Sequence, residues 1–346
     1  MSRILIIGNS MAVVGAIEKI RHSDQESTIT LFCTESLLPY DRRLLPALVA
    51  GEIKEAQTHP LAEDFFHQHH VEVIANERLA RVSLKRKYIT TESKRQIEYD
   101  QLLIADLGCL TLSLVKGHQK KGFFDCALLS SVKEAIKYLP FVDTVFISLT
   151  NLHGLNMACA LHGKVKEVVV VCLGQTLLHE VFDEETGTLL KQIMEGKGIR
   201  VILENSIEEI LGDSDIKAVR LQSGKVIGAQ MVIADFLPLD WRLVEQDSGY
   251  EKIEDDYFHN GLPLKPSHFG FKIIEGFCMG STKLLEDGRE FLKFDGPQNI
   301  FKKIFAKGEV LVGTVLFNSP SHEEKLLKII AEHIPVVGQE ETLIGD

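Results

Sequence analysis

The sequence of 346 residues predicts an α/β protein with two parallel sheets, each covered by helices. First, short apolar strands alternate with helices, which is typical of parallel sheets buried on both faces. Second, the order strand, small-residue turn, helix and second strand occurs at 3–35 and again at 144–174. Third, each half closes on an apolar strand followed by Ala-Asp, within 99–108 and 229–238. Two copies of this order predict two Rossmann-like domains.

The first half opens with the strand RILIIG, which leads through a turn into a helix. Ala12, Ala16 and Ile20 recur on one face of that helix, as expected where it covers a sheet. The segment TITLFCTE is the second parallel strand. The stretch 71–100 alternates apolar and polar residues, so we predict an antiparallel meander there.

The second half repeats the opening order and then adds elements of its own. The segment 183–198 has the apolar spacing of an amphipathic helix, and 219–230 is predicted to be a hairpin. Near the C-terminus, 301–317 reads as two strands joined at Lys307-Gly308, and 323–334 as a final helix. These last elements predict a small α+β C-terminal cap.

Composition excludes several classes of protein. The chain has 38 Lys and Arg against 49 Asp and Glu, a net charge of −11, which argues against nucleic-acid binding. No apolar run reaches about 18 residues, the length that a membrane span needs, and the N-terminus lacks the pattern of a signal peptide. We therefore expect a cytoplasmic protein. Six cysteines without metal or redox spacing are expected to be reduced and mostly buried: Cys33, Cys109, Cys126, Cys159, Cys172 and Cys278.

The turn after the first strand has part of a dinucleotide-binding pattern. Such a turn uses three glycines for the bend, for the approach of a pyrophosphate and for helix–strand packing. Here Gly8 keeps the first position, Ser10 replaces the second and Val13 the third. Glu35, at the end of the second strand, is placed to bind ribose hydroxyls. Both a dinucleotide site and an empty structural turn remain open.

The corresponding turn of the second half departs further from the pattern. Leu149 and Asn151 replace the first two glycines, and only Gly154 remains. A side chain at the first position disfavours positive φ at a cost of about 1–2 kcal/mol. The next strand ends in Cys172 where a carboxylate is usual. We therefore expect NAD(P)H not to bind at this turn.

Four segments in this order resemble the FAD-dependent pyridine-nucleotide oxidoreductases: 8–21, 37–53, 99–108 and 301–316. The similarity runs from Ile4 to about residue 329 and is greatest to NADH:rubredoxin reductases and the flavoprotein region of assimilatory nitrite reductases. The resemblance implies an FAD domain interrupted by an NAD(P)H domain, and a C-terminal interface domain. It also implies hydride transfer to a flavin and onward electron transfer to a redox protein or metal centre.

Carried over by position, the family's FAD contacts fall on Gly8, Ser10, Glu35 and Arg42, the last within Tyr-Asp-Arg. The closing Ala-Thr-Gly motif corresponds to residues starting at Ala105. In this chain the motif reads Ala-Asp-Leu, and its second copy Ala-Asp-Phe, so both glycines are lost. A lysine found in some relatives is Ala47, and the late Gly-Asp is Gly280-Ser281. The segment that covers the isoalloxazine in relatives is also shortened to about a dozen residues.

The implied organisation is an FAD-binding-like domain at 1–110 and 236–290, an NAD(P)-binding-like domain at 111–235, and an interface domain at 291–346. Two functions remain open. The lost motifs favour a non-catalytic redox-partner or regulatory subunit with at most weak FAD or adenine-nucleotide binding at the first turn, and homo- and hetero-oligomers both remain open. The alternative is an active FAD-dependent NAD(P)H oxidoreductase that passes electrons to a small redox protein or metal centre.

Other candidate sites are weaker. His67, His69 and His70 lie close in sequence, but no carboxylate or thiol is spaced to complete a tetrahedral metal site, so no metal is predicted. His153 and His162 flank the second helix and are interpreted as packing or surface residues rather than bases. Neither a nucleophile elbow nor a P-loop is present.

Overall fold

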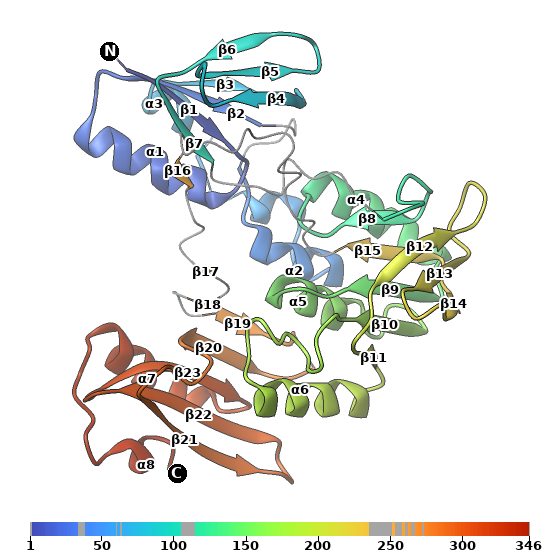
Figure 1. The fold of residues 1–346 in the computed structure, drawn as a ribbon, viewed down its shortest axis with the longest axis vertical. Coiled ribbons are helices and arrows are strands. Elements are labelled where there is room, and N and C mark those ends of the chain that lie inside the picture. Colours follow the sequence, from blue (N-terminus) through green and yellow to red (C-terminus); the bar gives the residue numbers. More distant parts are fainter. Residues whose placement is uncertain are drawn as a thin grey trace. The chain divides into compact units, whose positions relative to one another are not determined.

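The computed structural model describes residues 2–33, 39–59, 61–62, 64–104, 115–234, 251–252, 258–259, 262–263, 267–271 and 273–345. The chain divides into two compact units. Figure 1 labels the helices and strands. The first unit comprises Met1–Leu114, Ala127–Val132 and Phe236–Asp255, and the second comprises Val115–Cys126, Lys133–Asp235 and Asp256–Asp346. The four-part domain division made from the sequence stays a prediction.

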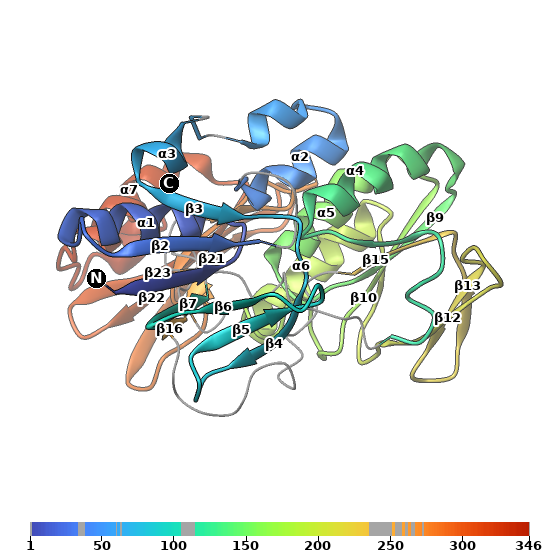
Figure 2. The ribbon, with the colours of Figure 1, turned by 90° about the horizontal axis from the view of Figure 1, so that it is seen from above.

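The first unit is built on a five-stranded parallel sheet in the order β16-β7-β1-β2-β3. The apolar run of β1 is buried on both faces. Ile4 and Ile6 pack with Val13 and Ile17 of helix α1, which lies along the sheet (Figure 2). The bounds are β1 Arg3–Ile7, β2 Thr28–Phe32, β3 Val71–Ile74, β7 Gln101–Ile104, β16 Glu251–Lys252 and α1 Met11–Ser23.

An antiparallel meander covers the opposite face of this sheet, where Leu5 and Ile7 pack with Val82 and Ile89. Its strands are β4 Leu79–Ser83, β5 Tyr88–Thr91 and β6 Gln96–Glu98. The sequence prediction began this meander at residue 71, which is wrong for β3, because β3 pairs in parallel with β2. Alternation of apolar and polar residues indicates that one face of a strand is exposed, and it does not distinguish a parallel edge strand from an antiparallel one. The remaining short elements are η1 Arg42–Leu44, α2 Leu45–Ala50, η2 Glu55–Thr58 and α3 Phe65–Gln68.

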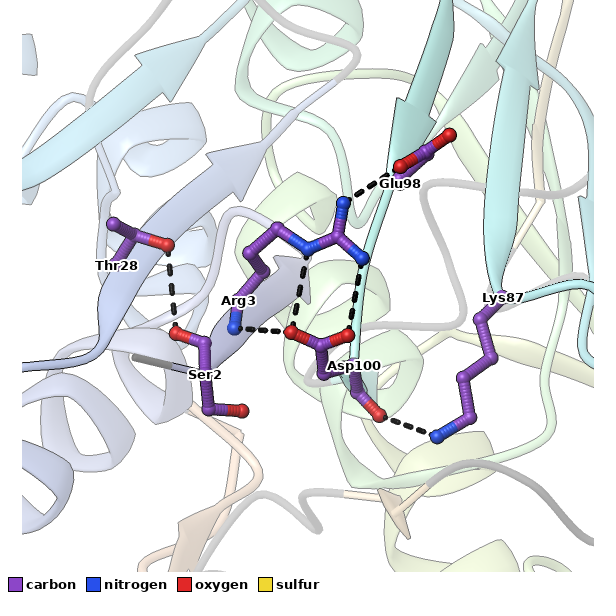
Figure 3. Close-up of polar contacts among 6 residues, drawn as sticks. All are labelled: Ser2, Arg3, Thr28, Lys87, Glu98 and Asp100. Carbon is purple, nitrogen blue, oxygen red and sulfur yellow. Dashed lines mark hydrogen bonds and ion pairs between the residues drawn. The ribbon is translucent and has the colours of Figure 1, made fainter.

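Two arginine side chains join separate elements of the first unit. The Arg3 guanidinium donates to both carboxylate oxygens of Asp100, at 3.2 and 3.0 Å, and to Glu98 at 2.6 Å (Figure 3). These bonds hold the pKa of Asp100 at about 2. At the end of α1, buried Arg21 donates to four carbonyl oxygens, which joins the helix to the turn before β3: those of Asp24, Ser27, His69 and His70.

The second unit repeats the parallel arrangement, in the order β11-β10-β9-β15-β8. The predicted hairpin at 219–230 is confirmed as β13 and β14, and Gly224 in its turn has φ +83°. The predicted amphipathic helix at 183–198 is confirmed as α6. The bounds are β8 Phe123–Asp125, β9 Thr144–Ser148, β10 Glu167–Val171, β11 Arg200–Ile202, β12 Ile207–Leu211, β13 Ala218–Leu221, β14 Val226–Gly228, β15 Met231–Ala234, α4 Leu129–Tyr138, η4 Leu139–Phe141, α5 Leu152–Leu161 and α6 Glu184–Gly196.

The C-terminal part of the second unit is an antiparallel sheet in the order β19-β20-β23-β22-β21, covered by α7. The predicted turn at Lys307-Gly308 and the final helix are both confirmed. Gly313 is required in β23, because a Cβ there would lie 1.8 Å from the Ser281 carbonyl oxygen. The bounds are β17 Phe258–His259, β18 Leu262–Pro263, β19 Ser267–Phe269, β20 Gly276–Gly280, β21 Gly288–Asp295, β22 Ile300–Lys307, β23 Val310–Phe317, α7 Pro320–Ala331 and α8 Glu340–Leu343.

The α/β fold class predicted from the sequence is therefore confirmed, with two parallel sheets, antiparallel sheets and an α+β C-terminal part. None of the helices that the structure describes has the length and apolar character needed to cross a membrane.

Candidate functional site

The turn between β1 and α1 has the backbone of a nucleotide-binding turn. Gly8 has φ +148°, in a region that residues with a Cβ rarely adopt, and its N–H donates to the Phe32 carbonyl at 3.1 Å. Strands β2 and β7 both end beside Ile7, so the turn lies at the carboxyl edge of the sheet. In open α/β sheets this edge is where ligands bind.

The polar groups of this turn have no partners within the part of the chain that the structure describes. Asn9 is fully buried, and neither its carboxamide nitrogen nor its oxygen bonds to any residue that the structure describes. Ser10, 5% exposed, occupies the N-cap of α1, but its hydroxyl caps no backbone amide and bonds to no other group in the described ranges. A buried polar group without a partner costs about 1–3 kcal/mol. These groups therefore suit a polar ligand at the N-terminus of α1, where the helix dipole favours an anion.

The Tyr-Asp-Arg segment, predicted to contact the flavin nucleotide, lies near the first turn. An isolated parallel bridge joins Ser10 to Tyr40, so the Tyr-Asp-Arg segment that ends in Arg42 lies beside the start of α1. Tyr40 is itself fixed, because its buried hydroxyl donates to the Ala127 carbonyl at 3.1 Å and accepts from the Leu129 amide at 2.9 Å. Glu35 and Ala105 lie outside the described residues.

Val13 replaces the third glycine of the pattern, the one that allows close packing of the helix on the strand. It is fully buried in the cluster formed by α1 and the sheet, together with Ile6 and Ile17. The valine side chain therefore contributes to the helix–sheet core of the first unit and does not prevent that packing.

The second turn has the same backbone connection but a different polar arrangement. The Leu149 N–H donates to the Val171 carbonyl at 2.9 Å, as Gly8 does to Phe32. Leu149 is buried and is not among the residues with positive φ, so the strain expected for a leucine in the glycine conformation is not incurred. Asn151 is the N-cap of α5, and its Oδ1 accepts from the amides of His153 and Gly154 at 2.8 and 3.2 Å.

The surrounding groups at the second turn are also paired. Nε2 of His153 lies 2.9 Å from the Cys126 carbonyl oxygen, so this nitrogen carries a proton and is not a free base. Cys172, directly after β10, is buried, so this strand end has a thiol where the sequence pattern predicted a carboxylate for a ribose site. The residue after it, Leu173, is 65% exposed.

Thiol and metal chemistry find little support in the described residues. Cys33, Cys126, Cys159, Cys172 and Cys278 are buried, as expected. Burial raises the pKa of Cys159 to about 12 and raises that of Cys278 further, which makes both thiols poor nucleophiles at neutral pH. Across the described ranges, no group of three or more His, Cys, Asp or Glu side chains is arranged to hold a metal ion. His69, from the histidine-rich segment, bonds the Phe65 carbonyl and stacks on its ring.

Comparison with known proteins places this geometry in a family. The model of the pyridine nucleotide-disulphide oxidoreductases matches residues 2–235. The chain belongs to this family. The chain is 24% identical to a nitrite reductase (NAD(P)H) of Bacillus subtilis, in an alignment covering 96% of this chain and 48% of that protein. It is 22% identical to a rubredoxin-NAD(+) reductase of Ectopseudomonas oleovorans, covering 66% of this chain and 60% of that protein.

Solved structures agree on the fold. The putidaredoxin reductase in its covalent complex with putidaredoxin has a TM-score of 0.78 at 16% identity, covering all of this chain and 96% of that one. A ferredoxin reductase from Rhodopseudomonas palustris has a TM-score of 0.72 at 17% identity, covering 92% and 91%. The resemblance read from the sequence is confirmed at the level of family and fold. The chain spans only about half the length of the nitrite reductase that it matches.

Sequence reasoning noted Asn151 only as a replaced glycine and assigned no role to Asn9. The capping role of Asn151 could have been found, because asparagine is among the preferred N-cap residues and it directly precedes the helix. The burial of Asn9 without a partner has no signal in the sequence, since it depends on how β1, α1 and the neighbouring strands pack.

Proposed function

We propose that this protein is an FAD-dependent oxidoreductase that passes electrons to a small redox protein, with the FAD pyrophosphate at the N-terminus of α1. The proposal rests on one observation above all. The carboxamide of Asn9 and the hydroxyl of Ser10 are buried without partners within the described residues, at the turn where this family binds a dinucleotide. Membership of the family and the similarity to a rubredoxin-NAD(+) reductase support it.

Each residue has a chemical role in this proposal. Gly8 lets the pyrophosphate approach the backbone, and Asn9 and Ser10 supply an amide and a hydroxyl donor to its oxygens. Arg42 serves the polar side of the flavin nucleotide, and Glu35 accepts from the ribose hydroxyls. Ala105 follows the strand that closes the domain. When bound, FAD supplies two-electron and one-electron transfer.

The relatives indicate the class of the electron acceptor but not its identity. One relative is a rubredoxin reductase and one structural neighbour is a putidaredoxin reductase, and both of these acceptors are small redox proteins. We propose a partner of the same class here. We also propose a cytoplasmic location, where the buried cysteines of the described residues would stay reduced.

A second candidate function is the non-catalytic redox-partner or regulatory subunit. The capped turn at Asn151 favours it, because a reductase of this family needs a place for NAD(P)H. In this version FAD or an adenine nucleotide still binds at the first turn, but NAD(P)H does not reduce the protein.

The test is the colour and the reduction of the purified protein. Incubation with FAD followed by desalting is expected to leave stoichiometric flavin with its visible absorption bands. Bleaching of those bands by NADH or NADPH would favour the NAD(P)H-dependent reductase. Retained flavin that only dithionite reduces would favour the second candidate. A protein that retains no flavin and shows no saturable FAD binding would refute both versions of the FAD site.

A further inference from the structure

The two turns of this chain form an internal comparison. Both follow a buried parallel strand, and in both the first turn residue donates its N–H to the neighbouring strand, Gly8 to Phe32 and Leu149 to Val171. They differ at the helix N-cap. The Ser10 side chain leaves α1 uncapped, whereas the Asn151 side chain accepts from two α5 amides.

We infer that the second turn is closed to pyridine nucleotides by Asn151, whose side-chain oxygen takes the hydrogen-bond donors that a pyrophosphate would need. A nucleotide pyrophosphate binds such a turn through the free amides at the helix N-terminus. Here the amides of His153 and Gly154 are already bonded to Oδ1 at 2.8 and 3.2 Å. The carboxamide oxygen therefore stands in for a phosphate oxygen.

Two further observations agree with a closed turn. Leu149 brings a buried branched side chain to the position where the pattern has its first glycine. The end of β10 offers no acceptor for a ribose, because Cys172 is buried and Leu173, 65% exposed, is apolar. NAD(P)H would have to displace Asn151, pass the leucine and leave its ribose hydroxyls without a carboxylate. The residues of this turn do not fit the group that the family implies.

The inference goes beyond the proposed function, because it concerns binding at α5 and holds with or without flavin at α1. It is tested by calorimetric titration of the full chain with NADH and with NADPH. The decisive variant is Asn151→Gly, which frees the two amides and costs the helix only a few tenths of a kcal/mol. Asn151→Asp is the matched control, since it keeps the capping oxygen and adds a negative charge. Circular dichroism checks that each variant is folded.

The expected result is no saturable binding to the wild type or to Asn151→Asp at millimolar nucleotide. Asn151→Gly, or its combination with Leu149→Gly, should bind at least tenfold more tightly than the wild type. Hydrogen exchange at the amides of His153 and Gly154 gives a second readout and should accelerate in Asn151→Gly.

Three results would overturn the inference. The first is micromolar binding to the wild type that Asn151→Gly does not improve. The second is a failure of both glycine variants to bind, because the barrier would then lie elsewhere. The third is unchanged exchange at the two amides. A chain that retains no FAD but gains NADH binding in Asn151→Gly would refute the proposed function and leave this inference standing.

Discussion

Replacement of Ser10 and Asn9 should change stability and FAD affinity in opposite directions. Ser10→Ala removes a buried hydroxyl, and Asn9→Leu replaces a buried carboxamide with an apolar side chain of similar size. In the flavin-free protein neither group has a partner among the described residues, so its removal eliminates a desolvation cost. In the complex with FAD, each would be a donor to a charged pyrophosphate.

The magnitudes follow from these two states. Removing one unsatisfied buried group should stabilise the flavin-free first unit by about 1 kcal/mol for the hydroxyl and up to about 2 kcal/mol for the carboxamide. A serine N-cap is normally worth about 1 kcal/mol, but the Ser10 hydroxyl makes no capping bond, so this loss does not apply. Loss of a hydrogen bond to a charged group costs about 1.5–3 kcal/mol, which corresponds to FAD binding about 10- to 100-fold weaker.

The assay has two parts, thermal unfolding of the flavin-free protein by circular dichroism and titration with FAD by flavin fluorescence. Ser23→Ala is the matched control on the same helix, because the Ser23 hydroxyl donates to the carbonyls of Lys19 and Ile20 and lies far along α1 from the turn. It should lower stability slightly and leave FAD affinity unchanged. If Ser10→Ala destabilises the flavin-free protein and binds FAD as well as the wild type, the reasoning is refuted.

Three other changes test the fold. Because the Arg3 guanidinium lowers the pKa of Asp100 from 3.8 to about 2, the wild type should lose stability more steeply than Asp100→Asn as pH falls between those values in acid titrations followed by circular dichroism. Arg21→Met should lower the free energy of urea unfolding by about 2–4 kcal/mol, since four carbonyl oxygens lose a charged donor. Gly313→Ala should lower the thermal midpoint of the second unit sharply, because its Cβ meets the Ser281 carbonyl at 1.8 Å.

Each of these has its own control. Gly308→Ala meets no atom within 4 Å and should cost only about 1 kcal/mol for its φ of +62°, so equal losses for the two glycine variants would contradict the packing argument. Parallel acid titrations of the wild type and Asp100→Asn would contradict the ion-pair assignment. A loss below 1 kcal/mol for Arg21→Met would mean that water replaces the guanidinium.

The sequence predicted those parts of the fold that depend on local order and periodicity. The repeated strand–turn–helix unit, the α6 helix and the hairpin at Gly224 all follow from apolar spacing and turn residues close in the chain. The pairing of β3 did not, because it depends on a partner about 40 residues away in sequence, and alternation does not report strand direction.

The position of the candidate site could be predicted from the sequence, but the hydrogen bonding of its polar groups could not. Gly8 and Ser10 marked the turn, and the bridge to Tyr40 brings the Tyr-Asp-Arg segment beside it. Whether each polar group is satisfied depends on tertiary packing. The number of glycines that each turn keeps indicates only how far it departs from the dinucleotide-binding pattern. Hydrogen bonding separates them by a different property. The Asn9 carboxamide has no partner among the described residues, whereas the Asn151 oxygen accepts from the amides of His153 and Gly154.

This difference carries a thermodynamic consequence for the whole chain. A turn with buried unpaired groups is costly in the absence of a ligand and gains stability from one that pairs them, so the first unit should be stabilised by FAD. A turn capped by its own side chain is already stable without a ligand. Nucleotide binding there gains only the difference between a phosphate oxygen and the Asn151 oxygen that it replaces. The repeated motif therefore supplies one ligand-dependent turn and one ligand-independent turn within a single fold, and the first unit alone should respond to added dinucleotide by a rise in its unfolding temperature.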